Sequence, residues 1–490
     1  MMNRTSENIV RVAGRVAAIG CLLVGSLVGA GAQASPFELY GASARGIALG
    51  NAMTAEAAAA DAVFYNVAAL TRSVPGVSVA FMVGTDGARV ALAPRPSGYD
   101  IQDYGSATPT VPSAGTQNVR SDTGALGTFG TVTIGGVTAL GSPRFRLGFL
   151  ATFPTFGVDG ASTRFSDERE RLFSNQLSYE LVGDRARRFD IEGGLAYRVF
   201  DQLSIGLGFT LLPTATIVNG VYLQNATDQS EVDIALLQRQ GFNAGFTAGI
   251  LGELADWMRL GLSFRQGVGF PIDGNNLIQI RGLSEGDVDE YPINQQLSWL
   301  PQSSPTTVSL GGAADLERTT IVLDVKWAQW ANYRDTQGED TGFENTLSPR
   351  AGVEYRYSDS TTARVGLSWD PSPVPEQTGR TNYVDNDRTG ASLGASHRFE
   401  LMGRDLQVSW YLQGQLLMSR ETAKASAVAY PQCADGVTVL CDEVPDDLSD
   451  PRTGAALPGT GGLQTGNPGF PGFSSGGWLG AMGVEFQWFL

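Results

Sequence analysis

The fold of this chain is decided by an alternating stretch, Leu203-Ser204-Ile205-Gly206-Leu207-Gly208-Phe209-Thr210-Leu211. Its odd positions are large and apolar, and its even positions are small or polar. Because successive side chains of a β-strand point to opposite faces, such a strand has one apolar face. The same alternation returns at residues 189–199, 260–264, 321–327, 365–369 and 408–416. The sequence therefore predicts an all-β protein.

Alternation fits two architectures, a soluble sandwich whose apolar faces pack together and a transmembrane antiparallel β-barrel whose apolar faces meet lipid. Three features favour the barrel. An alternating strand, Val484 to Leu490, runs to the last residue and is rich in aromatics. Aromatic residues such as Trp327, Trp330 and Tyr333 gather at strand ends, as in membrane-interface girdles. Short connections such as 358–360 alternate with long ones such as 419–477, as in outer-membrane barrels.

A count of the alternating segments predicts a barrel of about 14 strands. An even number places both ends of the chain on one side, the periplasm. The expected strands lie near residues 76–84, 128–140, 144–154, 185–199, 202–213, 241–253, 257–270, 304–315, 318–333, 347–358, 361–370, 388–399, 405–418 and 478–490. Residues 35–72 do not alternate and are rich in Ala and Gly, so we expect a compact insert there.

Composition narrows the functional classes. The chain has 490 residues, of which 17% are charged, with 34 Lys and Arg, 50 Asp and Glu, and 62 Gly. Low charge and near-zero mean hydropathy exclude a disordered chain and a polytopic helical membrane protein. The acidic balance, without clustered Lys and Arg, argues against a nucleic-acid partner.

The N-terminus and the cysteines indicate an exported protein. Arginines at positions 4, 11 and 15 precede an apolar run and the sequence Ala32-Gln33-Ala34, so residues 1–34 are predicted to be a signal peptide. Cys433 and Cys441 are the only cysteines after that segment, and an oxidising compartment favours a disulfide between them. A metal pair is the alternative, but no His or further Cys lies nearby in the sequence.

Enzymatic chemistry is not expected. The single histidine, His397, stands in an alternating segment, where lining of a lumen or an interface is the commoner role. No phosphate-binding glycine motif follows a strand, and the acidic residues of 435–450 lack the spacing of a calcium loop. We therefore expect no catalytic residues, no metal and no cofactor.

Both ends of the chain resemble a known family, the FadL-like outer-membrane transporters (OMPP1/FadL/TodX type). Residues 41–52 and 61–70 are similar to the family's N-terminal hatch, with Arg45, Gly46 and Asp61 in them, and its Asn-Pro-Ala signature falls on Asn66, Val67 and Ala68. Residues 370–377 and 385–388 resemble its Ser-Pro-Val-Pro loop and the Asp-Arg that opens the next strand. Residues 324–330 and 486–490 resemble its ninth and closing strands.

The resemblance implies three parts, a signal peptide (1–34), a hatch that plugs the lumen (35–72) and a barrel with long extracellular loops (73–490). It implies an outer-membrane location in a Gram-negative-type cell and uptake of long-chain fatty acids or related hydrophobic compounds. The implied partners are that hydrophobic ligand, outer-membrane lipid and lipopolysaccharide, and the barrel assembly machinery, which would recognise the C-terminal strand.

In the family, extracellular loops capture the ligand, the lumen binds it, and it leaves sideways near the third strand. Here that strand, Phe145 to Phe153, is followed by Pro154 and Gly157, which predicts a lateral opening there, or simply the end of the strand. The capture loops correspond to about 214–240 and 271–303, and residues 230–238 are expected to form a short helix. The candidate ligand-binding residues are Ile234, Leu237, Trp299, Leu300, Arg259 and Arg364.

Two other functions stay open. A nonspecific diffusion porin would leave its lumen unplugged and pass small hydrophilic solutes. A structural or surface-assembly barrel would use its long loops to bind another protein, and its loss would leave hydrophobic uptake unchanged.

Overall fold

The structure is a computed structural model, and only part of the chain is described below. It describes residues 36–93, 121–122, 128–156, 163–165, 176–178, 190–212, 215–223, 232–240, 242–268, 272–280, 293–299, 304–334, 340–376, 383–423, 443–444, 464–465 and 472–490. Several predictions fall outside these residues, namely those for the signal peptide (1–34), Gly157, Leu300, Cys433 and Cys441.

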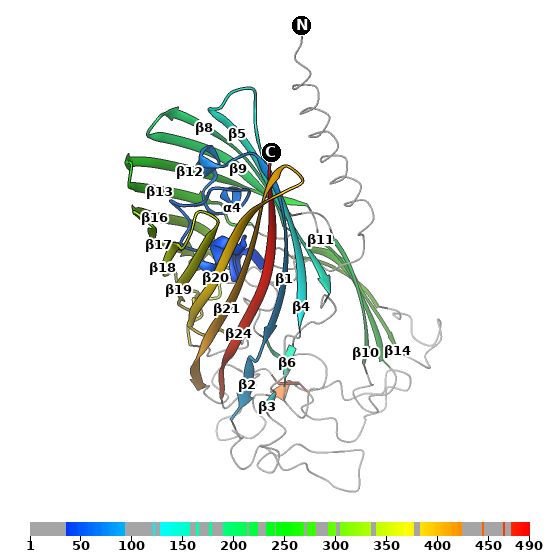
Figure 1. The fold of residues 1–490 in the computed structure, drawn as a ribbon. Helices are drawn as coiled ribbons and strands as arrows, with labels where there is room; N and C mark the ends of the chain where they lie inside the picture. Colours follow the sequence, from blue (N-terminus) through cyan, green and yellow to red (C-terminus); the bar gives the residue numbers. More distant parts are fainter. Residues whose placement is uncertain are drawn as a thin grey trace, which may run out of the picture.

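Fourteen antiparallel strands close into a barrel (Figure 1). In sheet order they are β1 (Gly76–Asp86), β4 (Phe129–Ala139), β5 (Phe145–Phe156), β8 (Asp190–Phe200), β9 (Leu203–Leu212), β12 (Asn243–Ala255), β13 (Met258–Arg265), β16 (Thr306–Leu316), β17 (Thr319–Gln329), β18 (Thr346–Arg356), β19 (Thr361–Asp370), β20 (Arg388–Leu401), β21 (Arg404–Ala423) and β24 (Gly472–Phe489). The last strand closes against the first, from Gly76↔Phe489 to Asp86↔Leu479. The predicted number and places of the strands are confirmed.

The alternation of the sequence appears as two faces of the wall. Leu207, Leu323 and Leu367 point outward and are 69%, 59% and 62% exposed. Their strand neighbours Thr210 and Asp324 are buried inside. An apolar outer face and a polar inner face are what a barrel needs when lipid surrounds it.

The two ends of the barrel differ. At one end, called the turn end, strands are joined by the short connections 140–144, 201–202, 256–257, 317–318, 357–360 and 402–403. Glu317 and Met402 adopt positive φ angles of 52° and 54° there, as tight two-residue hairpin turns require. The long connections lie at the opposite end, called the loop end. The strands β1 and β24 begin and finish the barrel at the turn end.

The N-terminal segment (residues 36–73) lies inside the barrel (Figure 1). It contains α2 (Pro36–Leu39), α3 (Ala44–Ala48), α4 (Ala62–Tyr65) and the 3₁₀ helix η1 (Val67–Arg72). Helix α3 packs against β19, β20 and β21, whereas η1 packs against β5, β8, β9 and β12. Its apolar side chains are almost fully buried, and Leu49, Met53 and Leu70 show 0% exposure. The core of the molecule is therefore the contact between this segment and the inner wall.

Inward-facing glycines let the wall and the N-terminal segment approach closely. An added Cβ at Gly206 of β9 would lie 2.6 Å from the backbone nitrogen of Ala68, and one at Gly352 of β18 would lie 2.7 Å from the carbonyl oxygen of Leu49. Neither distance leaves room for a carbon atom. The many glycines of the sequence thus include seats for this segment's backbone.

Two hairpins at the loop end form a second sheet. The connection from β9 to β12 carries β10 (Ala215–Leu223) and β11 (Val232–Gln240), and the connection from β13 to β16 carries β14 (Ile272–Ile280) and β15 (Ile293–Trp299). They pair in the order β10-β11-β14-β15, so the two connections share one four-stranded sheet, the loop sheet. The short helix predicted over residues 230–238 is wrong, because Val232, Ile234 and Leu236 alternate with period two and the backbone of β11 pairs on both sides.

The remaining elements are small. They are β2 (Arg89–Leu92), β3 (Ser121–Asp122), β6 (Thr163–Phe165), β7 (Gln176–Ser178), β22 (Glu443–Val444), β23 (Gln464–Thr465) and the 3₁₀ turn η5 (Trp330–Asn332). Strand β2 extends the barrel sheet beside β24. Within the described part of the chain, no helix is long and apolar enough to cross a bilayer.

Candidate functional site: a lumen cavity above an ion-paired floor

The predicted hatch motif forms one hydrogen-bonded unit. Asn66 is fully buried and caps η1, since its side-chain oxygen accepts from the backbone N–H of Ala68 at 3.1 Å. Its side-chain nitrogen donates to the carbonyl oxygens of Thr54 (2.8 Å) and Ile250 (3.0 Å). The asparagine therefore joins two turns of the N-terminal segment to strand β12. Val67 takes the middle position of the signature and is buried against the wall.

Gly46 and Asp61 belong to a second buried unit. The hydroxyl of Ser43 accepts from the N–H of Gly46 at 3.0 Å and donates to Asp61 at 2.5 Å. Burial raises the pKa of the Asp61 carboxyl above its ordinary value, against the hydrogen bond from Ser43 that lowers it. The Tyr65 hydroxyl accepts from the N–H of Ala42 and donates to the side chain of Asn51. These bonds fix the fold of the segment itself.

Arg45 belongs to an ion-paired group at the turn end of the barrel, called the Glu56 cluster. Its members are Arg45, Glu56 and Arg72 of the N-terminal segment and Arg259, Asp315, Glu354 and Arg364 of the wall. The carboxylate of Glu56 forms ion pairs with Arg45 at 2.8 Å, Arg72 at 3.2 Å and Arg259 at 2.5 Å. Burial would raise the pKa of Glu56, but the three guanidinium groups outweigh burial and hold that pKa below its ordinary value.

The wall residues of the cluster extend it across four strands. Arg259 of β13 also pairs with Asp315 of β16 at 2.6 Å. Glu354 of β18 pairs with Arg45 at 2.9 Å and with Arg364 of β19 at 2.6 Å. The two candidate ligand-binding arginines, Arg259 and Arg364, thus face the lumen as predicted and are nearly buried in ion pairs. Both arginines therefore belong to the Glu56 cluster at the turn end, and neither lines the lumen cavity nearer the loop end.

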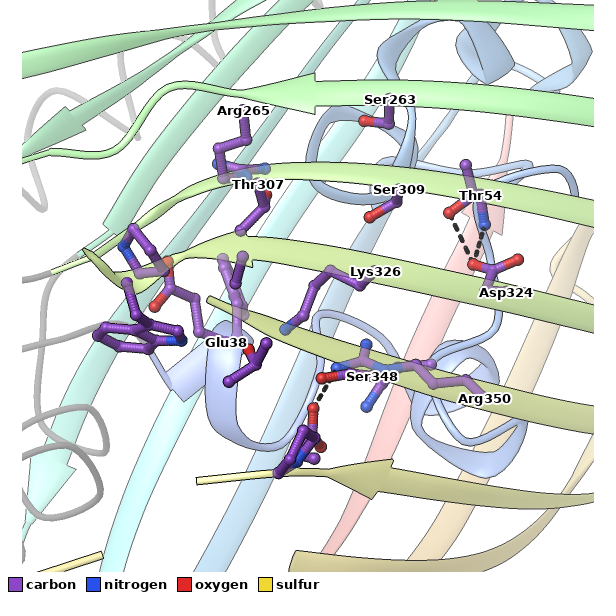
Figure 2. Close-up of a pocket in the computed structure, with 18 of the residues that line it drawn as sticks. Glu38, Thr54, Ser263, Arg265, Thr307, Ser309, Asp324, Lys326, Ser348 and Arg350 are labelled. Carbon is purple, nitrogen blue, oxygen red and sulfur yellow. Dashed lines mark hydrogen bonds and ion pairs between the residues drawn. The ribbon is translucent and has the colours of Figure 1, made fainter. Parts of the chain in front are cut away.

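A cavity lies between the N-terminal segment and the strands β13, β16, β17, β18, β19 and β20, nearer the loop end (Figure 2). Figure 2 shows Lys326 and Arg350 reaching into it from neighbouring strands, with Glu38 of the N-terminal segment among its lining residues. Apolar groups share the lining, namely Phe37, Phe64, Pro305, Trp330, Pro371 and Pro373. The space left for the centres of water molecules is about 80 Å³, so the cavity holds a small polar group without rearrangement.

The charged groups of the cavity differ in how completely they are paired. Arg265 grips Glu192 with two bonds of 2.6 and 2.9 Å and lies over the ring of Phe64. Asp324 accepts two bonds from Thr54, at 2.8 and 2.6 Å. Arg350 meets Asp370 at 3.2 Å through one nitrogen, while its Nε is buried without a partner among the described residues.

Arg388 is the least satisfied cation of the cavity. Its Nε and Nη1 atoms are both buried, and neither has a hydrogen-bond partner in the described ranges. A buried guanidinium N–H that lacks an acceptor costs more than the net value of an ordinary hydrogen bond. The pair Arg350 and Arg388 therefore offers donors to an anion.

An aromatic cluster borders the cavity at the loop end. It comprises Trp330, Tyr333 and Phe343, which follow β17, and Val374 and Tyr383, which follow β19. Tyr333 stacks on Phe343 with ring centres 4.7 Å apart, and Phe343 meets Tyr383 edge to face at 5.0 Å. Because Trp330 also lines the cavity, the cluster is continuous with it.

The loop sheet separates two of the residues predicted to bind ligand. Ile234 lies opposite Val221 and Ile278, whereas Leu237 lies opposite Val218 and Asn275, so the two belong to opposite faces. Trp299 shares the face of Ile234. The positions on that face are mainly apolar: Ile217, Val221, Leu223, Val232, Ile234, Leu236, Ile272, Ile278, Ile280, Ile293, Leu297 and Trp299. The face of Leu237 is mainly polar.

Strand β5 continues past Pro154, the residue at the predicted lateral opening. Its pairing with β4 reaches Gly130↔Phe156, with an irregularity beyond Pro154, so the alternative that Pro154 ends the strand is wrong. Its described pairing with β8 runs from Phe145↔Tyr197 to Thr152↔Asp190, the first described residue of β8.

Comparisons with known proteins agree with this architecture. A family model described as "Outer membrane protein transport protein (OMPP1/FadL/TodX)" matches residues 180–424, half of the chain. The chain belongs to this family. This match confirms the family and the outer-membrane location that the sequence predicted.

Relatives within and beyond the matched region are distant. The long-chain fatty acid transport protein of Escherichia coli O6:H1 is 26% identical over 275 residues, which cover 48% of this chain and 61% of that protein. Alkane uptake protein A of Marinobacter nauticus is 23% identical over 134 residues, 24% of this chain and 30% of that protein. A solved Pseudomonas aeruginosa FadL homologue covers 91% of this chain and 97% of its own, at 16% identity with a TM-score of 0.57. The chain thus spans about three fifths of the length of the Escherichia coli relative and less than a third of the alkane uptake protein.

Within this FadL/TodX barrel, several residues of the site were missed from the sequence. Lys326, Arg350, Asp370 and Arg388 stand on the polar face of alternating strands, and that pattern could have found them. Glu56 gave no signal, because it stands alone in an Ala-rich stretch. Among the described residues, no group of three or more His, Cys, Asp or Glu side chains is arranged to hold a metal ion.

Proposed function

We propose that this outer-membrane FadL/TodX-type protein takes up long-chain fatty acids or closely related hydrophobic acids. The observation that carries the proposal is the lumen cavity, where two incompletely paired arginines stand among apolar rings. An amphiphilic acid presents the complementary pair of features, a planar anion and an apolar chain. The name of the Escherichia coli relative supports the same class of substrate.

The head group would bind at Arg350 and Arg388. A carboxylate offers two oxygens to guanidinium donors, and charge-assisted bonds of this kind are about twice as strong as neutral ones. Three buried N–H donors are available, namely Nε and Nη1 of Arg388 and Nε of Arg350. Folding has already removed these donors from water, so a carboxylate that binds them does not have to offset that desolvation again. Lys326 adds a further positive charge to the lining.

The alkyl chain needs more room than the cavity leaves. With about 80 Å³ free, the site admits a head group, and the chain would enter by displacing Phe37 and its helix α2 or by parting the aromatic cluster. Helix α2 is four residues long, which makes it the smaller obstacle. We infer that α2 moves when ligand binds while the rest of the hatch stays seated.

The proposed transport path begins at the loop sheet and ends at the barrel wall beside Pro154. The apolar face of the loop sheet, which includes Ile234 and Trp299, would collect the ligand outside the cell. Release would occur sideways beside Pro154, since proline offers no N–H to a neighbouring strand. The C-terminal strand β24 would serve the barrel assembly machinery, and lipopolysaccharide would surround the outer rim.

A hydrocarbon is the second candidate substrate, favoured by the similarity to the alkane uptake protein over a quarter of the chain. Such a ligand would use the aromatic cluster and have no use for the arginines. A nonspecific porin is disfavoured because the N-terminal segment occupies the lumen. Its helix α3 packs against β19–β21, and its helix η1 packs against β5, β8, β9 and β12.

Uptake of labelled oleate and of a labelled aromatic hydrocarbon by cells with and without the gene tests the proposal. We expect oleate uptake to fall on deletion and to return with the wild-type gene. Arg388→Gln should weaken oleate binding by about ten- to 150-fold, because bonds to charged groups are worth about 1.5–3 kcal/mol. Arg398→Gln is the matched control, since Arg398 is exposed and pairs with Asp405 at the turn end. Unchanged uptake of both compounds on deletion would refute the transport proposal.

A further inference from the structure

The Glu56 cluster occupies one level of the barrel, at its turn end. Arg259 stands beside the first residue of β13, and Asp315 stands beside the last residue of β16. Glu354 lies two residues before the end of β18. In outer-membrane barrels the short turns face the periplasm, so this level is the periplasmic floor of the lumen.

Glu56 holds both halves of the N-terminal segment to that floor. Arg45 comes from α3 and Arg72 from η1, and both reach the same carboxylate. Arg259 joins that carboxylate to the wall through its bonds to Glu56 and Asp315. Glu56 is 5% exposed, so most of its contacts are shielded from water.

Among the carboxylates of the cluster, Glu56 makes the most ion pairs in the described part of the chain, three against two for Glu354 and one for Asp315. The cluster has four arginines and three carboxylates. Without the charge of Glu56, Arg45 keeps Glu354 and Arg259 keeps Asp315, but Arg72 loses the one ion pair that it makes among the described residues. Two carboxylates would then face four guanidinium groups in a partly buried space, where like charges repel strongly.

We propose that Glu56 is the central residue of a periplasmic seal that closes the barrel to water and small ions. This inference rests on the proposed role of the N-terminal segment as a hatch. The seal separates two tasks within one lumen. The cavity near the loop end receives a hydrophobic acid, while the floor stops polar solutes and directs the ligand away from the axial outlet.

The test is the ion conductance of the purified full-length protein in planar lipid bilayers. Glu56→Gln keeps the size of the side chain and removes its charge. We expect frequent open events and a several-fold higher mean conductance than in the wild type. Asp405→Asn is the matched control, since it removes the exposed pair with Arg398 at the same end, and it should conduct like the wild type.

Folding is checked separately by the shift in gel mobility on heating, which reports barrel closure. A second variant, Arg259→Gln, should also conduct more than the wild type when its barrel is correctly folded. The double variant should leak less than the sum of the two single variants, because both changes break the same Glu56–Arg259 pair. Wild-type conductance in both correctly folded single variants would overturn the proposal. Additive leaks would also overturn it. Oleate uptake by the wild type is measured in parallel, so that failure of transport and failure of the seal are distinguished.

Discussion

The close packing of the N-terminal segment on the barrel wall leads to a prediction for Gly206→Ala. The added Cβ would lie 2.6 Å from the backbone nitrogen of Ala68 and 2.7 Å from the carbonyl carbon of Val67. Ordinary contacts of such a carbon begin near 3.4 Å, so wall and hatch must separate by about 0.8 Å. Both sides of the contact are backbone, and no side chain can rotate away.

The shift affects the bonds that hold η1. Asn66 bonds to Ile250 at 3.0 Å, and Thr71 bonds to Ser204 at 2.8 Å. Inserting one carbon into a packed core costs about 1–3 kcal/mol, which should raise the equilibrium constant for local detachment of the N-terminal segment by about five- to 150-fold. The barrel itself should stay closed, because its strand pairing does not involve this contact.

Hydrogen exchange followed by mass spectrometry measures this directly. Peptides covering residues 62–73 should exchange about five- to 150-fold faster in Gly206→Ala, while peptides of β19 and β20 keep the wild-type rate. Gly414→Ala is the matched control, because an added Cβ there meets no atom within 4 Å. Equal protection of residues 62–73 in the wild type and Gly206→Ala would refute the close packing of the N-terminal segment on the wall.

Three further predictions concern other parts of the molecule. Pro154→Ala should slow oleate uptake without changing the binding affinity, because alanine restores a backbone N–H through which β5 can pair with a neighbouring strand. Faster uptake would contradict a lateral exit at this position. The seal should persist as the pH falls to about 4.3, the ordinary glutamate pKa. The pKa of Glu56 is lowered, so its carboxylate stays charged at that pH and its stabilising effect is lost only at lower pH. A bilayer conductance that already increases while the pH is still above about 5 would contradict this. Phe343→Ala should destabilise the packing of the aromatic cluster by about 3–5 kcal/mol. Proteolysis within residues 330–345 should then be faster than in Phe200→Ala, a variant of an exposed phenylalanine. Equal cleavage of the two variants would show that the cluster does not order this loop.

The sequence by itself determined the barrel. Period-two alternation fixes which face of each strand is apolar, and a strand slipped by one residue would place Leu207 inside and Thr210 in lipid. For that reason all fourteen strands could be located, and the lumen-facing arginines Arg259 and Arg364 were recognised from their polar face. The local pattern failed at residues 230–238, where acidic residues after a serine indicated a helix. Two neighbouring loops pairing into one sheet decided that region, and no local pattern contains such a contact.

The tertiary structure alone decided what the charged residues do. Arg259 and Arg388 both occupy inner faces of strands, yet the first is neutralised in the floor and the second stands with buried nitrogens beside the cavity. The difference is that Glu56 of the N-terminal segment reaches Arg259, whereas no described acceptor reaches Nε or Nη1 of Arg388. Glu56 meets Arg259 across 203 residues of sequence, and alternation cannot reveal such a contact, because periodicity fixes a side chain's face but not its partner.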